Sequence, residues 1–286
     1  MKVTQSFKSD EVHTRILKML YAAVYSEVYQ NREWRDFAFE EFNRLASVGD
    51  FLPRTFNCGG RLFLCFAFNW LVNNGIVQYS DRLGERINRL FYRNEIIWDC
   101  SPDMISVIDN DIDGEGVLML NLFKESDTLE RYALQEKMIY HLNELDRILS
   151  GDQELVDLKI LNPLYICSIL YFITVCDEKK IFPFRTSNLL CQINDLWHSK
   201  EREEWCNILF KYIFRKESRK EYTNETESLY CVATENESLA MFLFLHGMSE
   251  DLDFYSLERL PSPEDVKSNW GYWLCRIYIV LKNGKL

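Results

Sequence analysis

Apolar residues recur along much of this chain at intervals of three and four, the spacing of one buried face of an α-helix. This pattern predicts amphipathic helices over residues 9–28, 33–48, 81–92, 127–149, 186–198 and 200–217. Residues 218–236 are polar and show no such period, so a loop is predicted there. The C-terminal segment 272–281 fits either a helix or a strand by its pattern alone.

A second kind of segment is apolar on nearly all sides, which is typical of a helix buried all round. Such segments lie at about 58–75, 113–124, 164–176 and 238–245. Gly75 can end the first in a left-handed conformation, and Asn162-Pro163 is a favourable start for the third. An amphipathic helix follows most of these inner segments, which predicts repeated helical hairpins. We therefore expect an all-α protein forming a single domain over residues 1–286.

Several stretches resemble the N-terminal and middle hairpins of LanC-like proteins, the lanthionine synthetase cyclase family. They are Trp34 to Glu40, Leu52-Pro53, Trp70 to Val77, Asn162 to Phe172, and Ile181 to Phe184. The resemblance implies an α/α toroid, in which inner helices ringed by outer helices surround a central cavity. It further implies that the loops before the inner helices face this cavity, where Asn57, Arg61, Asp113 and Glu115 would line it.

The chain departs from the family pattern at the residues that carry its chemistry. Family inner helices open with Gly-x-x-Gly-x-Gly, whereas here the first repeat has Gly60, Phe63 and Cys65 at these positions. The second repeat keeps Gly114 and Gly116. The family's zinc is held by two cysteines and a histidine, one cysteine directly preceding the histidine in Cys-His-Gly, but no Cys-His pair occurs in this sequence. We therefore expect no catalytic residues of the family type, no metal and no cofactor.

Two candidate metal sites have simpler explanations. Cys206 and His246-Gly247 are the nearest approach to a zinc site, which needs three or four converging ligands. The alternative is a buried thiol and a cationic histidine at a helix C-terminus. Asp109-x-Asp111-x-Asp113-Gly114 matches the first half of a calcium loop, but position 12 is Leu120 instead of Glu. The alternative is an acidic loop that leads into a helix N-terminus.

Composition narrows the classes of partner. The net charge of −11 argues against nucleic-acid binding, which needs a basic surface. Nine scattered cysteines without close pairing favour reduced, mostly buried thiols in a cytoplasmic protein. We expect no secretory signal, because residues 1–8 lack an apolar core, and no membrane span, because the longest apolar runs fall short of roughly 18 residues.

Three functional hypotheses remain open. The leading one is a non-catalytic LanC-like binding or accessory protein whose partner is a peptide or a peptide-modifying enzyme. The second is a metal-independent enzyme, lanthionine-cyclase-like or carbohydrate-active, that uses cavity carboxylates such as Asp113 and Glu115. The third is a structural or oligomerisation role. The oligomeric state, the ligand and the closure of the ring do not follow from the sequence.

Overall fold

The structure, a computed structural model, describes most of the chain. The described residues are 9–49, 52, 56, 60–78, 80–92, 112–125, 128–150, 162–214, 223–249 and 259–283. All regular elements in these ranges are helices, which confirms the all-α prediction for the described part of the chain.

The chain divides into two compact units. Unit 1 comprises Met1–Met104 with Tyr255–Leu286, and unit 2 comprises Ile105–Phe254. The toroid and the single domain over residues 1–286 stay predictions, and each unit is described by itself below.

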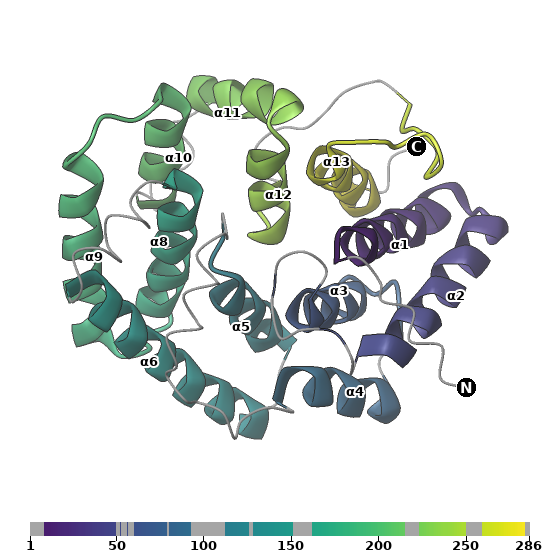
Figure 1. Cartoon of the computed structure of the whole chain (residues 1–286), viewed down its shortest axis with the longest axis horizontal. Coiled ribbons are helices and arrows are strands. Elements are labelled where there is room, and N and C mark those ends of the chain that lie inside the picture. Colours follow the sequence, from purple (N-terminus) through teal and green to yellow (C-terminus); the bar gives the residue numbers. More distant parts are fainter. Residues whose placement is uncertain are drawn as a thin grey trace. The chain divides into compact units, whose positions relative to one another are not determined.

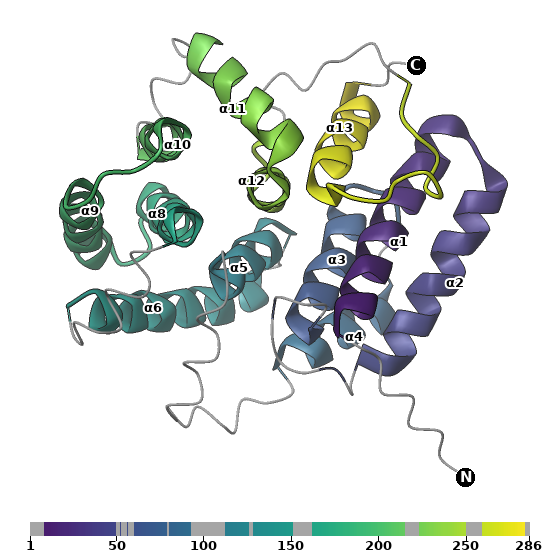
Figure 2. The same ribbon diagram turned by 45° about the horizontal axis from the view of Figure 1, so that its top comes forward.

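Unit 1 is built around α1 (Ser9–Tyr29). This helix packs against α2 (Arg32–Val48), α3 (Arg61–Asn73) and α13 (Trp270–Asn283), and α3 also packs against α4 (Asp81–Tyr92) (Figures 1 and 2). Every residue of α3 from Arg61 to Leu71 is buried, as its apolar pattern predicted. The helix ends before Gly75, whose φ of 69° is the left-handed conformation that glycine adopts without strain. The segment at 272–281 is helical.

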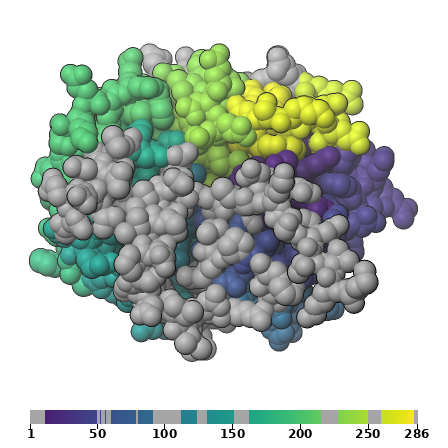
Figure 3. Space-filling model, viewed as in Figure 1, coloured from purple at the N-terminus to yellow at the C-terminus, as the bar shows by residue number. Residues whose placement is uncertain are grey.

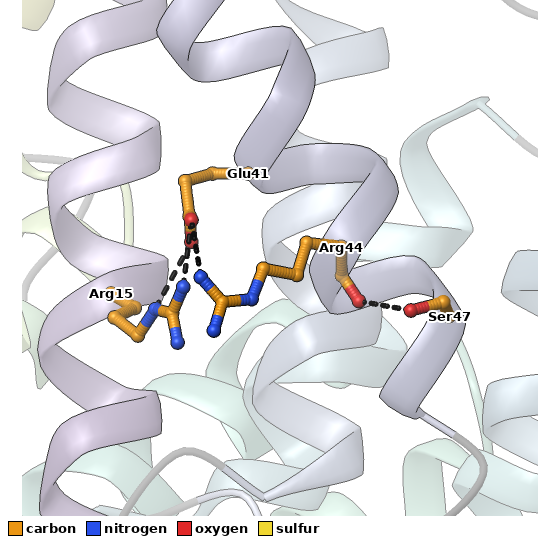
Figure 4. Close-up of polar contacts among 4 residues, drawn as sticks. All are labelled: Arg15, Glu41, Arg44 and Ser47. Carbon is orange, nitrogen blue, oxygen red and sulfur yellow. Dashed lines mark hydrogen bonds and ion pairs between the residues drawn. The ribbon is translucent and has the colours of Figure 1, made fainter.

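An ion-pair cluster joins α1 to α2 (Figure 4). The guanidinium of Arg15 donates two hydrogen bonds to the Glu41 carboxylate, at 3.1 and 2.7 Å. Arg44 approaches the same carboxylate at 3.6 Å, and its carbonyl accepts a hydrogen bond from the Ser47 hydroxyl at 2.7 Å. Arg15 and Glu41 are largely buried. Because the two-pronged contact fixes both side chains, it orients the hairpin as well as stabilising it.

Unit 2 contains seven described helices. They are α5 (Gly114–Glu125), α6 (Thr128–Ser150), α8 (Pro163–Glu178), α9 (Pro183–His198), α10 (Glu204–Phe214), α11 (Thr223–Glu235) and α12 (Glu237–Leu245). The pairs α5–α6 and α8–α9 are antiparallel hairpins, and α8 also packs against α5, α10 and α12 (Figures 1 and 2). Side chains of α9, α10 and α11 form part of the surface of unit 2 (green in Figure 3).

The start of α8 follows its sequence. The side-chain oxygen of Asn162 accepts hydrogen bonds from the backbone N–H groups of Leu164 and Tyr165, at 3.0 and 3.3 Å. Pro163 occupies the first helical position, where its missing N–H costs nothing. Most of the residues that follow up to Cys176 are buried, as expected for an inner segment.

The prediction of a loop at 218–236 is wrong over residues 223–235, where the chain forms α11. Among the described side chains of this helix, Leu229 and Ala233 are fully buried. Two buried residues spaced by four give too weak an apolar period for a helix to be recognised in a polar sequence. Packing against α10 and α12 therefore stabilises a helix that the pattern by itself does not predict.

Seven cysteines lie among the described residues, and five of them are buried thiols. Cys191 and Cys231 are exposed, so the prediction of mostly buried thiols holds for this part of the chain. None of the described helices combines the length and the apolar character needed to cross a bilayer.

Candidate functional site: a buried polar network in unit 2

Four polar side chains meet where helices of the unit 2 core converge. Asp113 directly precedes α5, His141 lies on α6, Ser168 lies in the middle of α8, and His246 follows the last residue of α12. Their exposed fractions are 6% for Asp113, 1% for Ser168 and 5% for His246, while the His141 side chain is 16% exposed. Buried polar groups need partners, and these four are partners of one another.

Asp113 forms two sets of bonds at the start of α5. One carboxylate oxygen, Oδ1, accepts a hydrogen bond from the backbone N–H of Gly116 at 3.2 Å, which is the bond of an N-cap residue. The other, Oδ2, lies 2.9 Å from Nε2 of His141. The helix-capping interpretation of the acidic loop is therefore confirmed for Asp113. Asp109 and Asp111, the other residues of the calcium-loop hypothesis, lie outside the described residues.

The charge of Asp113 is maintained in spite of its burial. Burial by itself raises the pKa of a carboxyl group. The positive charge and hydrogen bond of His141 and the N–H of Gly116 act in the opposite direction, and the nearby His246 adds to them. Together they outweigh burial and lower the pKa of Asp113 below its ordinary value. The carboxylate is consequently ionised at neutral pH and forms an ion pair when His141 is protonated.

Gly116 is needed for this arrangement. A Cβ atom at residue 116 would lie 2.4 Å from Oδ2 of Asp113, 3.0 Å from its Cγ and 3.1 Å from Cδ2 of Phe172. The shortest of these distances is well inside van der Waals contact, so a side chain at this position would displace the carboxylate. The second glycine of the Gly114-x-Gly116 pattern therefore makes room for the Asp113–His141 pair.

Ser168 and His246 continue the network on the other side of Asp113. The backbone N–H of Asp113 donates to Oγ of Ser168 at 3.0 Å. Oγ in turn lies 3.0 Å from Nε2 of His246, and Nδ1 of His246 lies 2.8 Å from the carbonyl oxygen of Phe242. Because a carbonyl oxygen can only accept, Nδ1 carries the imidazole proton and Nε2 accepts from the Ser168 hydroxyl. Every proton in this chain of hydrogen bonds is then assigned to one donor atom.

His246 lies at the C-terminus of α12, as predicted, but its surroundings favour the neutral imidazole instead of the predicted cation. Burial lowers the pKa of His246 to about 4, although the Phe242 carbonyl and the Asp113 charge act to raise it. Aromatic rings enclose the imidazole, with Phe242 stacked at 4.0 Å and Tyr171 edge-on at 4.9 Å between ring centroids. The desolvation of a charged imidazole in these surroundings outweighs the attraction to the helix carbonyls.

Two further acid–base groups lie within electrostatic range of Asp113. Burial raises the pKa of Tyr165, and the negative charges of Asp113 and Glu115 raise it further. Glu115, in the first turn of α5, is half-buried. Asp113 and Glu115 therefore give this end of unit 2 a negative charge, beside which the Tyr165 hydroxyl stays protonated.

The other candidates from the sequence lie elsewhere or outside the described residues. Arg61 is the buried first residue of α3 in unit 1, and Asn57 lies outside the described residues. That Asn57, Arg61, Asp113 and Glu115 line one cavity stays a prediction. Cys206 is buried on α10, and Cys167 is buried on α8. The pKa values of both thiols are raised, chiefly by burial. Within the described residues, no three or more His, Cys, Asp or Glu side chains are grouped to hold a metal ion.

His141 and Ser168 were not predicted as site residues from the sequence, although the apolar pattern around each of them indicates a buried polar group. His141 falls on the face of α6 that contains the buried residues Met138, Leu142 and Leu145. Ser168 interrupts an apolar run. A polar residue at a position where the period requires an apolar one indicates a buried hydrogen bond, and both residues meet this criterion.

No family model, curated protein or solved structure matches the chain. The LanC-like relationship therefore stays a resemblance, and the function must be argued from the site.

Proposed function

We propose that the chain is a non-catalytic, LanC-like helical-hairpin protein that acts as a binding or accessory module, with a peptide or a peptide-modifying enzyme as its partner. The observation that carries this proposal is the bonding of His246. His246-Gly247 resembles the last two residues of the family's Cys-His-Gly triplet. Its Nδ1 donates to the Phe242 carbonyl, and its Nε2 accepts from the Ser168 hydroxyl.

Ser168 thus occupies the position at Nε2 where a metal ion would bind to an imidazole in this orientation. The residue before His246 is Leu245, a buried apolar side chain without ligand atoms. These contacts use the His246 imidazole to hold α8 and α12 together. They support a protein that keeps the hairpin scaffold for binding, and a toroid that joins both units is part of this proposal.

Zinc binding gives the first test. The purified chain is incubated with zinc, passed through a desalting column and analysed for metal, beside a His246→Gln variant. We expect the same sub-stoichiometric zinc content in both proteins. One zinc per chain that disappears in His246→Gln would overturn the proposal.

Peptide binding gives the second test. A fluorescent peptide with one cysteine and one dehydroalanine is titrated with the chain, in a lysine-rich form and in a glutamate-rich form of equal length. Because the chain carries a net charge of −11, we expect the anisotropy to rise for the lysine-rich peptide, and more at low salt. The peptide thiol should remain available for alkylation. Loss of the thiol only when the chain is present would show cyclase activity, and no binding of either peptide would overturn the peptide partner.

A metal-independent enzyme is the second candidate, and the Asp113–His141 pair favours it. A carboxylate that orients an imidazole is a common arrangement of a general base, and Glu115 would add an acid group nearby. We expect this function to show as turnover of a glycoside or of the dehydroalanine peptide that is lost in Glu115→Gln. Turnover that Glu115→Gln leaves unchanged would exclude a role for this carboxylate.

A further inference from the structure

The Ser168–His246 bond joins α8 to α12, and its direction depends on one proton. Ser168 accepts from the Asp113 N–H and donates to Nε2 of His246. Nδ1 of His246 already donates to Phe242. If Nε2 also gained a proton, two donors would face each other across 3.0 Å. The serine hydroxyl would have to rotate and leave its hydrogen among buried neighbours, which costs free energy.

The surroundings of His246 oppose that second proton. From α8, Ser168 and the ring of Tyr171 face the imidazole, and from its own helix Phe242 stacks on it. From the start of α5, Asp113 is the negative charge acting on it, but the same carboxylate is paired with His141 of α6. On α11, which also packs against α12, the described titratable side chains are Tyr230, Cys231 and Glu235, the last two exposed.

We propose that the Ser168–His246 contact is an acid-sensitive latch in unit 2, which holds α12 against α8 while His246 is neutral and releases α12 when His246 takes up a second proton. This inference is independent of the proposed function, because it concerns the attachment of one helix within the unit.

Acid favours the release of α12 over a defined range of pH. The pKa of His246 is about 4 in the closed unit, compared with an ordinary histidine value of 6.5 once the helix is released. The latch is at full strength above pH 6.5 and weakens as the pH falls toward 4. Between these values release takes up as much as one proton, so the opening equilibrium rises by up to about tenfold for each pH unit.

Amide hydrogen exchange followed by mass spectrometry measures this opening directly. After correction for the intrinsic rate, the peptide covering α12 (237–247) should lose protection by roughly 40-fold in all from pH 6.5 to 4.5. The peptide covering α9 (183–198) should keep its protection, because α9 packs against α6 and α8 and is not held by His246. Parallel loss of protection in both peptides would mean that the whole unit unfolds, and would overturn the latch.

Two variants show whether His246 is the group that takes up the proton. His246→Gln keeps an oxygen that can accept from Ser168 but cannot be protonated in this range, so the pH dependence of the α12 peptide should disappear. His198→Gln replaces an exposed histidine at the end of α9 and should leave the slope unchanged. A slope that persists in His246→Gln would overturn the latch.

The imidazole of the unmodified protein provides a test that needs no variant. At pH 7, the nitrogen NMR shifts of the His246 ring should show the proton on Nδ1. A proton on Nε2 would contradict the direction of the Ser168 bond, and with it the latch.

Discussion

Replacing Gly116 with alanine is expected to destabilise unit 2 by displacing the Asp113 carboxylate, although alanine is the better helix former. The new Cβ would lie 2.4 Å from Oδ2 of Asp113, so the carboxylate must move away. The displaced carboxylate loses the Gly116 N–H, worth about 1 kcal/mol as an N-cap bond. It also loses His141, and a hydrogen bond to a charged group contributes roughly 1.5–3 kcal/mol. The higher helix propensity of alanine offsets at most about 1 kcal/mol of this loss.

The net expectation for Gly116→Ala is a loss of roughly 1.5–3 kcal/mol in the free energy of unfolding at pH 7. For a unit of this size that corresponds to a fall in Tm of about 4–10 °C. Urea denaturation followed by far-ultraviolet circular dichroism gives the free energy, and thermal scans give the Tm.

A double-mutant cycle with Asp113→Ala isolates the cause. Without the carboxylate, the next contact of the alanine at position 116 is Cδ2 of Phe172, at 3.1 Å. The added cost of Gly116→Ala should then be close to zero, or become a small gain. An equal cost in both backgrounds would refute the reasoning, because the clash would then not involve Asp113.

Three further substitutions, two of them with a comparison variant, test local features of the fold. Asn162→Ala removes the cap of α8 and should cost about 1 kcal/mol in urea denaturation; an unchanged midpoint would contradict the capping role. Glu41→Gln should destabilise unit 1 by about 1 kcal/mol, less at high salt, whereas Asp36→Asn, in an exposed pair with Arg32, should leave the unfolding curve unchanged. Gly75→Ala should cost roughly 1–2 kcal/mol in thermal scans because its φ is 69°, although nothing lies within 4 Å of the new Cβ; Gly75→Asn should recover part of this loss.

A helix that buries a continuous apolar surface can be predicted from its sequence. The run from Leu62 to Leu71 predicted a fully buried helix, and α3 is that helix. Helix α11 could not be predicted in this way, because only Leu229 and Ala233 are fully buried among its described side chains. A helix held mainly by its neighbours has little apolar period of its own, so its sequence resembles that of a loop.

The candidate site was predictable in part. Asp113 was selected for its place before a helix N-terminus, and its capping bond follows from local geometry. Its partner His141 lies 28 residues further along the chain and Ser168 lies 55 residues away. Pairings over such distances depend on how the helices pack, and local spacing does not determine them.

The sequence by itself determined that the chain is helical, where most of its helices begin and end, and which segments are buried on all sides. These properties follow from the apolar period, the caps and the glycines, which act over a few residues. Only the tertiary structure decided that Asp113, His141, Ser168 and His246 meet, and that His246 is neutral. The charge of an imidazole depends on the solvent and the charges around it, and in unit 2 those surroundings come from separate helices brought together by packing.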